Sequence, residues 1–128
     1  MSDPIVFIAR QKIKDGNLEG YKQLFQEVVE FIKPNKPNTI AFLNYVNDDG
    51  TEATQIQMYA NIESMEQHMQ GLGEIAKKSY EFMDVMAFEI YGNPTGAVLT
   101  MMTNLAKSGV PVKIMPQRIG GFIRLQGG

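Results

Sequence analysis

The stretch that decides the fold spans residues 55–68 and reads Gln55-Ile56-Gln57-Met58-Tyr59-Ala60-Asn61-Ile62-Glu63-Ser64-Met65-Glu66-Gln67-His68. Polar and apolar side chains alternate over residues 55–60, which predicts a strand with two different faces. One face would carry Gln55, Gln57 and Tyr59, and the other Ile56, Met58 and Ala60. Ser64 and Gln67 have the spacing of a capping box, so we expect a helix to begin at Ser64. His68, the only histidine of the chain, then lies on the first turns of that helix.

Three further strands are predicted around this stretch. Residues 4–13 are rich in β-branched and apolar side chains on both faces, which indicates a strand that is covered on both sides. Residues 38–47 alternate as well, and the Asp49-Gly50 pair that follows suits a hairpin loop leading into the strand over residues 52–60. Residues 84–91 form the last predicted strand of the core.

Two helices are expected between these strands. Apolar residues recur at helical spacing over residues 17–33, and we expect the helix to stop there because Pro34 disfavours a helical residue before it. The second helix carries an apolar stripe over residues 65–80. Gly71 and Gly73 weaken this stripe, so we expect a bend or a break that divides the helix into two pieces.

The resulting β-α-β-β-α-β order predicts an α+β, ferredoxin-like fold, in which helices cover one face of an antiparallel sheet. We expect residues 1–93 to form this core. In the first and last strands, both faces carry large apolar residues. Whichever face of the sheet the helices leave open is therefore apolar and needs to be covered. A homodimer joined through the sheet faces is therefore expected.

Residues 94–128 extend the core within the same domain. We expect a helix over residues 95–107, followed by short extended pieces at 110–115 and 121–125. Prolines and glycines interrupt these pieces, which makes them unsuitable as a central strand. We interpret them as a lid or as an arm that embraces the dimer partner.

Composition excludes several classes of function. The chain of 128 residues has a formal net charge of -2 and no run of Lys or Arg, so neither a nucleic acid nor an anionic membrane is an expected partner. The absence of cysteine excludes disulfides, cysteine-ligated zinc and thiol nucleophiles. With a single histidine we expect no metal site. No segment has the roughly 20 apolar residues that span a bilayer, and no secretory leader is recognisable, so we expect a cytoplasmic protein.

Three residues within this fold order resemble a known pattern. Tyr59 closes the third strand, Glu63 lies in the following turn, and His68 comes nine positions after the tyrosine. In these features the chain resembles the antibiotic biosynthesis monooxygenase family, whose members are dimeric α+β barrels, over about residues 5–91. It departs from the family where Asn35-Lys36-Pro37-Asn38 replaces a common Glu-Pro-Gly turn, and it lacks a second histidine. The absence of tryptophan argues against the haem-degrading branch.

The resemblance implies a cofactor-independent monooxygenase that oxidises an electron-rich aromatic, quinol or polyketide-like molecule with dioxygen, without metal or flavin. It implies a pocket between sheet and helices and a catalytic set of His68, Tyr59 and Arg10, in which the histidine is suited to proton transfer near neutrality. The side chains implied in binding a small apolar or aromatic ligand are Asn44, Gln57, Met58, Met69, Leu72 and Met86.

Alternatives remain open at this point. The sequence does not decide which set of alternating side chains faces the pocket. Arg10 and Glu89 also suit a cross-strand ion pair, and the methionines also suit an ordinary core. The alternative function is a non-catalytic small-ligand-binding or assembly protein of the same fold.

Overall fold

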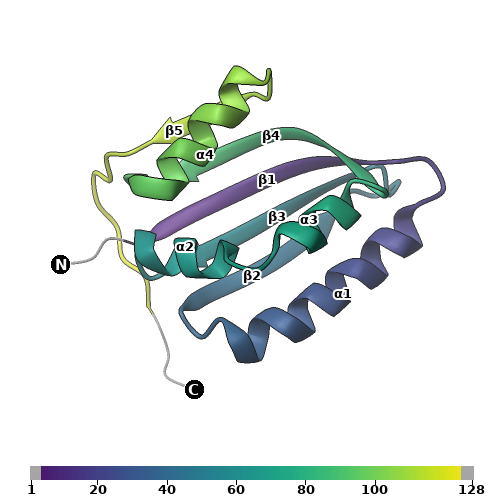
Figure 1. Cartoon of the computed structure of the whole chain (residues 1–128), viewed down its shortest axis with the longest axis horizontal. Helices are drawn as coiled ribbons and strands as arrows, with labels where there is room; N and C mark the ends of the chain where they lie inside the picture. The colour runs from purple at the N-terminus through teal and green to yellow at the C-terminus, as the bar shows by residue number, and fades with distance from the viewer. Residues whose placement is uncertain (1–3, 125–128) are drawn as a thin grey trace.

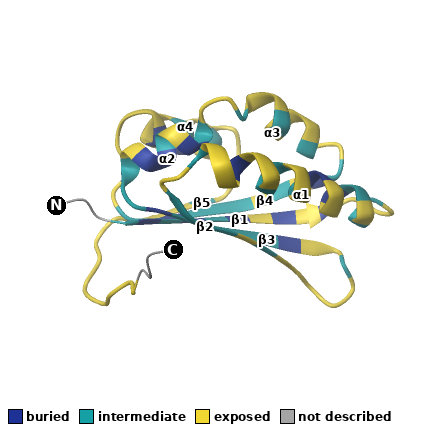
Figure 2. Cartoon of the chain, turned by 90° about the horizontal axis from the view of Figure 1, so that it is seen from below, coloured by how far each residue is buried: buried dark blue, intermediate teal, exposed yellow. Residues whose placement is uncertain are grey.

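A computed structural model describes residues 4–124 of the chain. The strands are β1 (Ile5–Ile13), β2 (Thr39–Val46), β3 (Glu52–Tyr59), β4 (Met83–Tyr91) and β5 (Val112–Met115). The helices are α1 (Leu18–Asn35), α2 (Ile62–Met69), α3 (Gly73–Ser79) and α4 (Gly96–Lys107). These helices lie on one face of the sheet and leave the other face open (Figure 1 and Figure 2).

The sheet has five strands in the order β2-β3-β1-β4-β5. Strands β1 to β4 pair antiparallel in the ferredoxin-like arrangement, so the predicted fold class is confirmed. β5 pairs parallel with β4 and makes the sheet mixed. Since parallel strands need a crossover connection, α4 serves as the link that brings β5 to the sheet edge. The expected arm is therefore confined to the residues after β5. Residues 121–124 form no strand, and Leu125 of the predicted piece lies outside the described residues.

Strand register decides which side chains face the helices. Gln57 pairs with Phe7 of β1 and with Phe42 of β2. Phe7, Gln57 and Tyr59 are 7%, 8% and 0% exposed, which places this set beneath the helices. The polar side of β3 therefore points inward, and Met58 lies on the open face.

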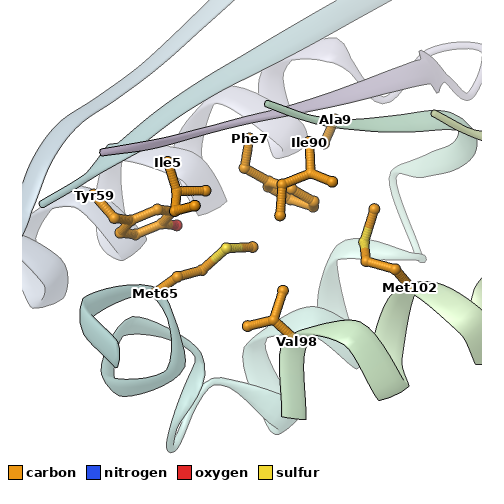
Figure 3. Close-up of a cluster of buried hydrophobic side chains, with 8 residues drawn as sticks. All are labelled: Ile5, Phe7, Ala9, Tyr59, Met65, Ile90, Val98 and Met102. Carbon is orange, nitrogen blue, oxygen red and sulfur yellow. The ribbon is translucent and has the colours of Figure 1, made fainter. Parts of the chain in front are cut away.

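The main core lies between the sheet and helices α2 and α4. Its buried members are Ile5, Phe7, Ala9, Tyr59, Met65, Ile90, Val98 and Met102. Met65 of α2 and Val98 and Met102 of α4 point toward the strands in Figure 3. A second buried cluster, made of Ile13, Tyr21, Ala53 and Met83, lies near the start of α1. Residues 96–107 thus pack on the same sheet as the rest of the chain.

Gly71 separates α2 from α3, as the glycines predict. Its φ of +80° is one that residues with a Cβ rarely adopt. α3 has no buried residue, whereas α2 buries Ser64, Met65 and His68. The second helical region is therefore a well-packed piece followed by a loosely packed one.

The start of α2 differs from the prediction. Asn61, and not Ser64, is the N-cap, and its side-chain oxygen accepts hydrogen bonds from the backbone N–H and the hydroxyl of Ser64, at 2.8 and 2.7 Å. Asparagine satisfies orphan N–H groups as well as serine does, so the earlier residue caps the helix and Ser64 lies in its first turn.

The end of α1 also differs. The helix continues through Pro34 to Asn35. Pro34 donates no N–H to the helix, but the carbonyls of Phe31 and Ile32 in the last turn find other donors. The Asn35 side-chain amide donates to Phe31 O at 2.8 Å, and the Lys36 N–H donates to Ile32 O at 2.9 Å. These two bonds hold the last turn together beyond the predicted stop.

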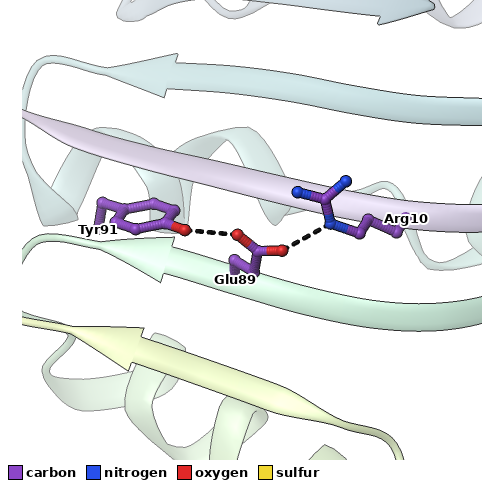
Figure 4. A network of polar contacts seen from close by, with 3 residues as sticks. All are labelled: Arg10, Glu89 and Tyr91. Carbon is purple, nitrogen blue, oxygen red and sulfur yellow. Dashed lines mark hydrogen bonds and ion pairs between the residues drawn. The ribbon is translucent and has the colours of Figure 1, made fainter.

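The open face of the sheet carries exposed apolar side chains and one polar cluster. Leu43 and Tyr45 of β2 are 45% and 59% exposed. In the cluster shown in Figure 4, Glu89 accepts hydrogen bonds from Arg10 Nε, at 2.6 Å, and from the Tyr91 hydroxyl. The hydrogen bond from Arg10 lowers the pKa of Glu89. The cross-strand ion pair that the sequence left as an alternative for Arg10 is therefore formed.

Candidate ligand-binding site

A cavity of about 200 Å³ lies between the helix-facing side of the sheet and helices α1 and α3. Its walls are rich in aromatic rings, contributed by Phe7, Phe25, Phe42 and Phe88. Phe7 stacks on Phe88 and Phe25 stacks on Phe42, with ring centroids 5.4 and 5.1 Å apart. No Asp, Glu, Lys or Arg lies among the described lining residues. The cavity therefore suits an uncharged molecule with a flat apolar body.

His68 contributes one wall of this cavity. The side chain comes from the last turn of α2 and is 4% exposed. Its Nδ1 lies 2.8 Å from Thr39 Oγ1 at the start of β2. The imidazole ring meets Tyr59 edge-on at 5.0 Å and Phe42 at 5.4 Å between ring centroids. These contacts fix the ring and leave Nε2 as the nitrogen that a ligand can reach.

The surroundings of His68 keep the ring uncharged at neutral pH. Burial lowers the pKa of His68 to about 4, and the positive charge of Lys36 contributes. The Lys36 ammonium donates to the carbonyl oxygens of Gln67 and Gln70 at the end of α2, at 2.7 and 2.9 Å. The lysine is therefore held close to the histidine, and a second positive charge is unfavourable there.

A row of polar side chains follows β3 away from His68. The Tyr59 hydroxyl donates to Gln57 Oε1, and Gln57 Nε2 donates to Gln55 Oε1 at 3.1 Å. Burial raises the pKa of Tyr59, so its hydroxyl stays protonated. Tyr59 itself is fully buried behind the cavity lining, whereas Gln55 and Gln57 form part of that lining. The structure thus places Tyr59 as a support for Gln57.

A second polar chain reaches the cavity from α1 and β2. Asn44 Nδ2 donates to the Tyr21 hydroxyl at 2.7 Å, and that hydroxyl donates to Gln11 Oε1 at 2.5 Å. Burial raises the pKa of Tyr21. Asn44 Oδ1 is buried and has no hydrogen-bond partner in the described part of the chain. This end of the cavity is therefore polar, and the described residues do not supply a hydrogen bond to every buried polar atom there.

The structure brings only part of the predicted site together. His68, Gln57 and Leu72 line the cavity, Tyr59 lies behind it, and Asn44 reaches it through Tyr21.

The other predicted site residues lie elsewhere. Met69 packs against the main core. Strand register turns Arg10 and Met58 to the open face, so neither lies in the cavity. Met86 lies at a β-bulge opposite Arg10 and Gln11, where it is 43% exposed and also outside the cavity. Arg10 cannot act on the same ligand atom as His68.

Several residues of the site, in the lining or in contact with it, were not predicted. Gln11 continues the buried set of alternating side chains of β1, and a polar residue at a buried strand position could have signalled a cavity. Gln55 shares the face of Gln57, which could have given the same signal. Thr39 and Tyr21 carried no signal in the sequence, because their contacts join segments that are distant along the chain.

Comparison with known proteins establishes the fold. No family model matches the chain, and no curated protein matches it in sequence. MupZ from Pseudomonas fluorescens matches with a TM-score of 0.75 and 15% identity over 96% of this chain and 96% of that chain. SnoaB, a cofactor-independent oxygenase from Streptomyces nogalater, matches with a TM-score of 0.61 and 11% identity over 75% of this chain and 98% of that one.

A third match is a candidate antibiotic biosynthesis monooxygenase from Bacteroides thetaiotaomicron, with a TM-score of 0.59 and 16% identity over 75% of this chain and 91% of that chain. The chain thus has the ferredoxin-like α+β fold of the antibiotic biosynthesis monooxygenase-like proteins. At such identities the likeness concerns the fold alone.

Two further features of the described residues bear on other functions. Residues 4–124 contain no helix with the length and apolar character needed to cross a membrane. The same residues contain no group of three or more His, Cys, Asp or Glu side chains arranged to hold a metal ion.

Proposed function

We propose that this protein is a cofactor-independent monooxygenase acting on an electron-rich aromatic, quinol or polyketide-like molecule. The observation that carries the proposal is the uncharged, buried His68 at the wall of an aromatic cavity without charged lining residues. The fold shared with a cofactor-independent oxygenase supports it.

The chemistry needs a base and a dry cavity. His68 Nε2 accepts a proton from an acidic C–H or O–H of the substrate, and the resulting carbanion passes an electron to dioxygen. Recombination forms a C–O bond and a hydroperoxide, which loses water to give a carbonyl. In this scheme a CH₂ group and O₂ become a C=O group and H₂O, and the substrate supplies all the electrons.

The contacts of His68 suit this role. In the tautomer that carries its proton on Nδ1, Thr39 Oγ1 accepts that proton's hydrogen bond and Nε2 has a free lone pair. A negative charge that forms on the substrate next to the ring stabilises the imidazolium, which offsets the cost of charging a buried histidine. The apolar walls exclude water from the carbanion.

We further propose that a second copy of the chain covers the open face of the sheet. Leu43, Tyr45 and Met115 are 45%, 59% and 50% exposed, and such an apolar surface favours association. The segment after β5 lies along the same face, where residues 116–118 and 120–123 border a cavity with Val6, Met58 and Tyr91 (Figure 2). An arm in this position would contact a partner subunit.

We also propose a cytoplasmic location. The chain contains no cysteine, so its fold gains nothing from an oxidising compartment.

The reaction is tested by dioxygen uptake with a panel of quinols and anthrone-type phenols. We expect uptake with the wild-type protein and a loss of at least about 100-fold in His68→Asn, the typical contribution of a positioned base. Lys78→Ala, on the exposed surface of α3, is the control and should keep the wild-type rate. Binding without uptake would instead support the non-catalytic ligand-binding alternative.

A further inference from the structure

We propose that Gln11 and Gln55 form a subsite that binds a carbonyl oxygen of the ligand, at the end of the cavity away from His68. The ligand would then be an uncharged aromatic ketone. The subsite is a claim about binding, and only its link to oxidation rests on the proposed function.

Strand register brings the two glutamines together. Gln11 of β1 lies opposite Ala53 of β3, and Gln55 lies opposite Ala9. They are therefore diagonal neighbours on the helix-facing side, a spacing at which long side chains reach a common point. Both line the cavity, and Gln11 is 4% exposed. Asn44 stands opposite Gln55 on β2, so carboxamides from three strands meet at this end.

The hydrogen bonds leave these glutamines with donors to spare. Gln55 Oε1 accepts from Gln57 at 3.1 Å, and Gln11 Oε1 accepts from Tyr21 at 2.5 Å. A carboxamide nitrogen carries two hydrogens. A hydrogen bond from Gln55 lowers the pKa of Tyr21, and this bond uses at most one of the two N–H groups of Gln55. At least one N–H of each glutamine therefore remains for a ligand.

The N–H donors of the two glutamines are uncharged, and this determines which chemical class of ligand the subsite can bind. Two N–H groups match the lone pairs of one carbonyl oxygen. No Asp, Glu, Lys or Arg lines the cavity among the described residues, so a carboxylate or phosphate would lose its hydration without gaining a counter-charge. Asn44 Oδ1, which is buried without a hydrogen-bond partner among the described residues, is an acceptor and needs a donor, so it does not bind the carbonyl oxygen.

The distance between the two ends fixes how the ligand lies. Gln55 and Tyr59 are four residues apart on β3, which corresponds to roughly 13 Å, and His68 lies beside Tyr59. A ligand whose carbonyl contacts the glutamines therefore places its opposite edge toward His68, with its rings between Phe7 and Phe42.

The test compares α-tetralone with tetralin, which has the same rings but no carbonyl, by calorimetric titration without dioxygen. We expect wild-type protein to bind the ketone about tenfold more tightly than the hydrocarbon, as befits hydrogen bonds in a buried site. Gln11→Leu and Gln55→Leu should each reduce this preference severalfold while tetralin affinity is kept. Gln26→Leu, on the exposed side of α1, is the control and should keep the preference.

The ratio of the two affinities makes the test independent of small losses of stability, which affect both ligands alike. An equal preference in wild type and in both variants would overturn the subsite, and so would failure of the ketone to bind the wild type at its solubility limit. A normal preference together with absent dioxygen uptake would leave the subsite standing and remove the proposed reaction.

Discussion

Thr39 Oγ1 lies 2.8 Å from His68 Nδ1 and joins the first residue of β2 to the last turn of α2. This bond sets the orientation of the only histidine in the chain, and the threonine hydroxyl can accept from or donate to Nδ1. The histidine is 4% exposed, so a variant without the threonine hydroxyl leaves Nδ1 without its partner in the protein. Thr39 is therefore a positioning residue, and its hydroxyl should matter more than its shape.

Thr39→Val should lower the activity about tenfold and destabilise the protein by about 1–2 kcal/mol, because a buried ring nitrogen loses its partner. Thr39→Ser keeps the hydroxyl and should restore most of the activity. Urea unfolding and dioxygen uptake measure the two effects. Equal behaviour of the valine and serine variants would show that the hydroxyl has no role.

Stability should depend on the protonation of His68. The pKa is about 4 in the folded protein and about 6.5 in the unfolded chain, so the unfolded chain binds more protons between these values. The free energy of unfolding should therefore fall as the pH drops through this window, by at most about 3 kcal/mol. Below pH 4 this group contributes no further change.

Urea unfolding at pH 7.0, 6.0 and 5.0 checks this dependence, with His68→Gln as the comparison. The range stays above the pH at which Glu89, whose pKa is lowered by Arg10, begins to lose its ion pair. The variant should show a flatter profile than the wild type. Parallel profiles would mean that the histidine is not responsible.

Capping of α2 distinguishes the structure from the sequence-based prediction. Asn61→Ala should cost about 1 kcal/mol of stability, because the backbone N–H and the hydroxyl of Ser64 both donate to the Asn61 side chain. Ser64→Ala should cost less, since it keeps the cap. Thermal unfolding of the two variants measures the difference, and the reverse order would restore Ser64 as the cap.

The open face should control association. Leu43→Glu adds a charge where we propose that a second copy packs, and we expect it to shift the protein toward monomer. Leu99→Glu, on the outer side of α4, is a matched control, since the two leucines are 45% and 42% exposed. Sedimentation velocity reports the change. A monomeric wild-type protein at micromolar concentration would refute the proposed dimer.

Much of the fold could be predicted because each strand and helix has a clear period. The inward face of β3 could not, since Gln55, Gln57 and Tyr59 are the polar set and a polar set ordinarily faces water. These side chains point inward because they line a cavity and bond to one another. Arg10 was placed with His68 because the sequence did not show which face of β1 points inward. The extended piece at residues 110–115 was predicted, but its parallel pairing with β4 was not, since a short segment next to prolines does not indicate which strand it joins.

The proposed function depends on His68 being uncharged and buried at the cavity wall. A nitrogen-15 NMR titration of the imidazole tests it directly, since a single histidine gives an unambiguous signal. We expect a midpoint near 4 and a change in the Nε2 signal when α-tetralone binds. A midpoint near 6.5, with no response to the ligand, would contradict it.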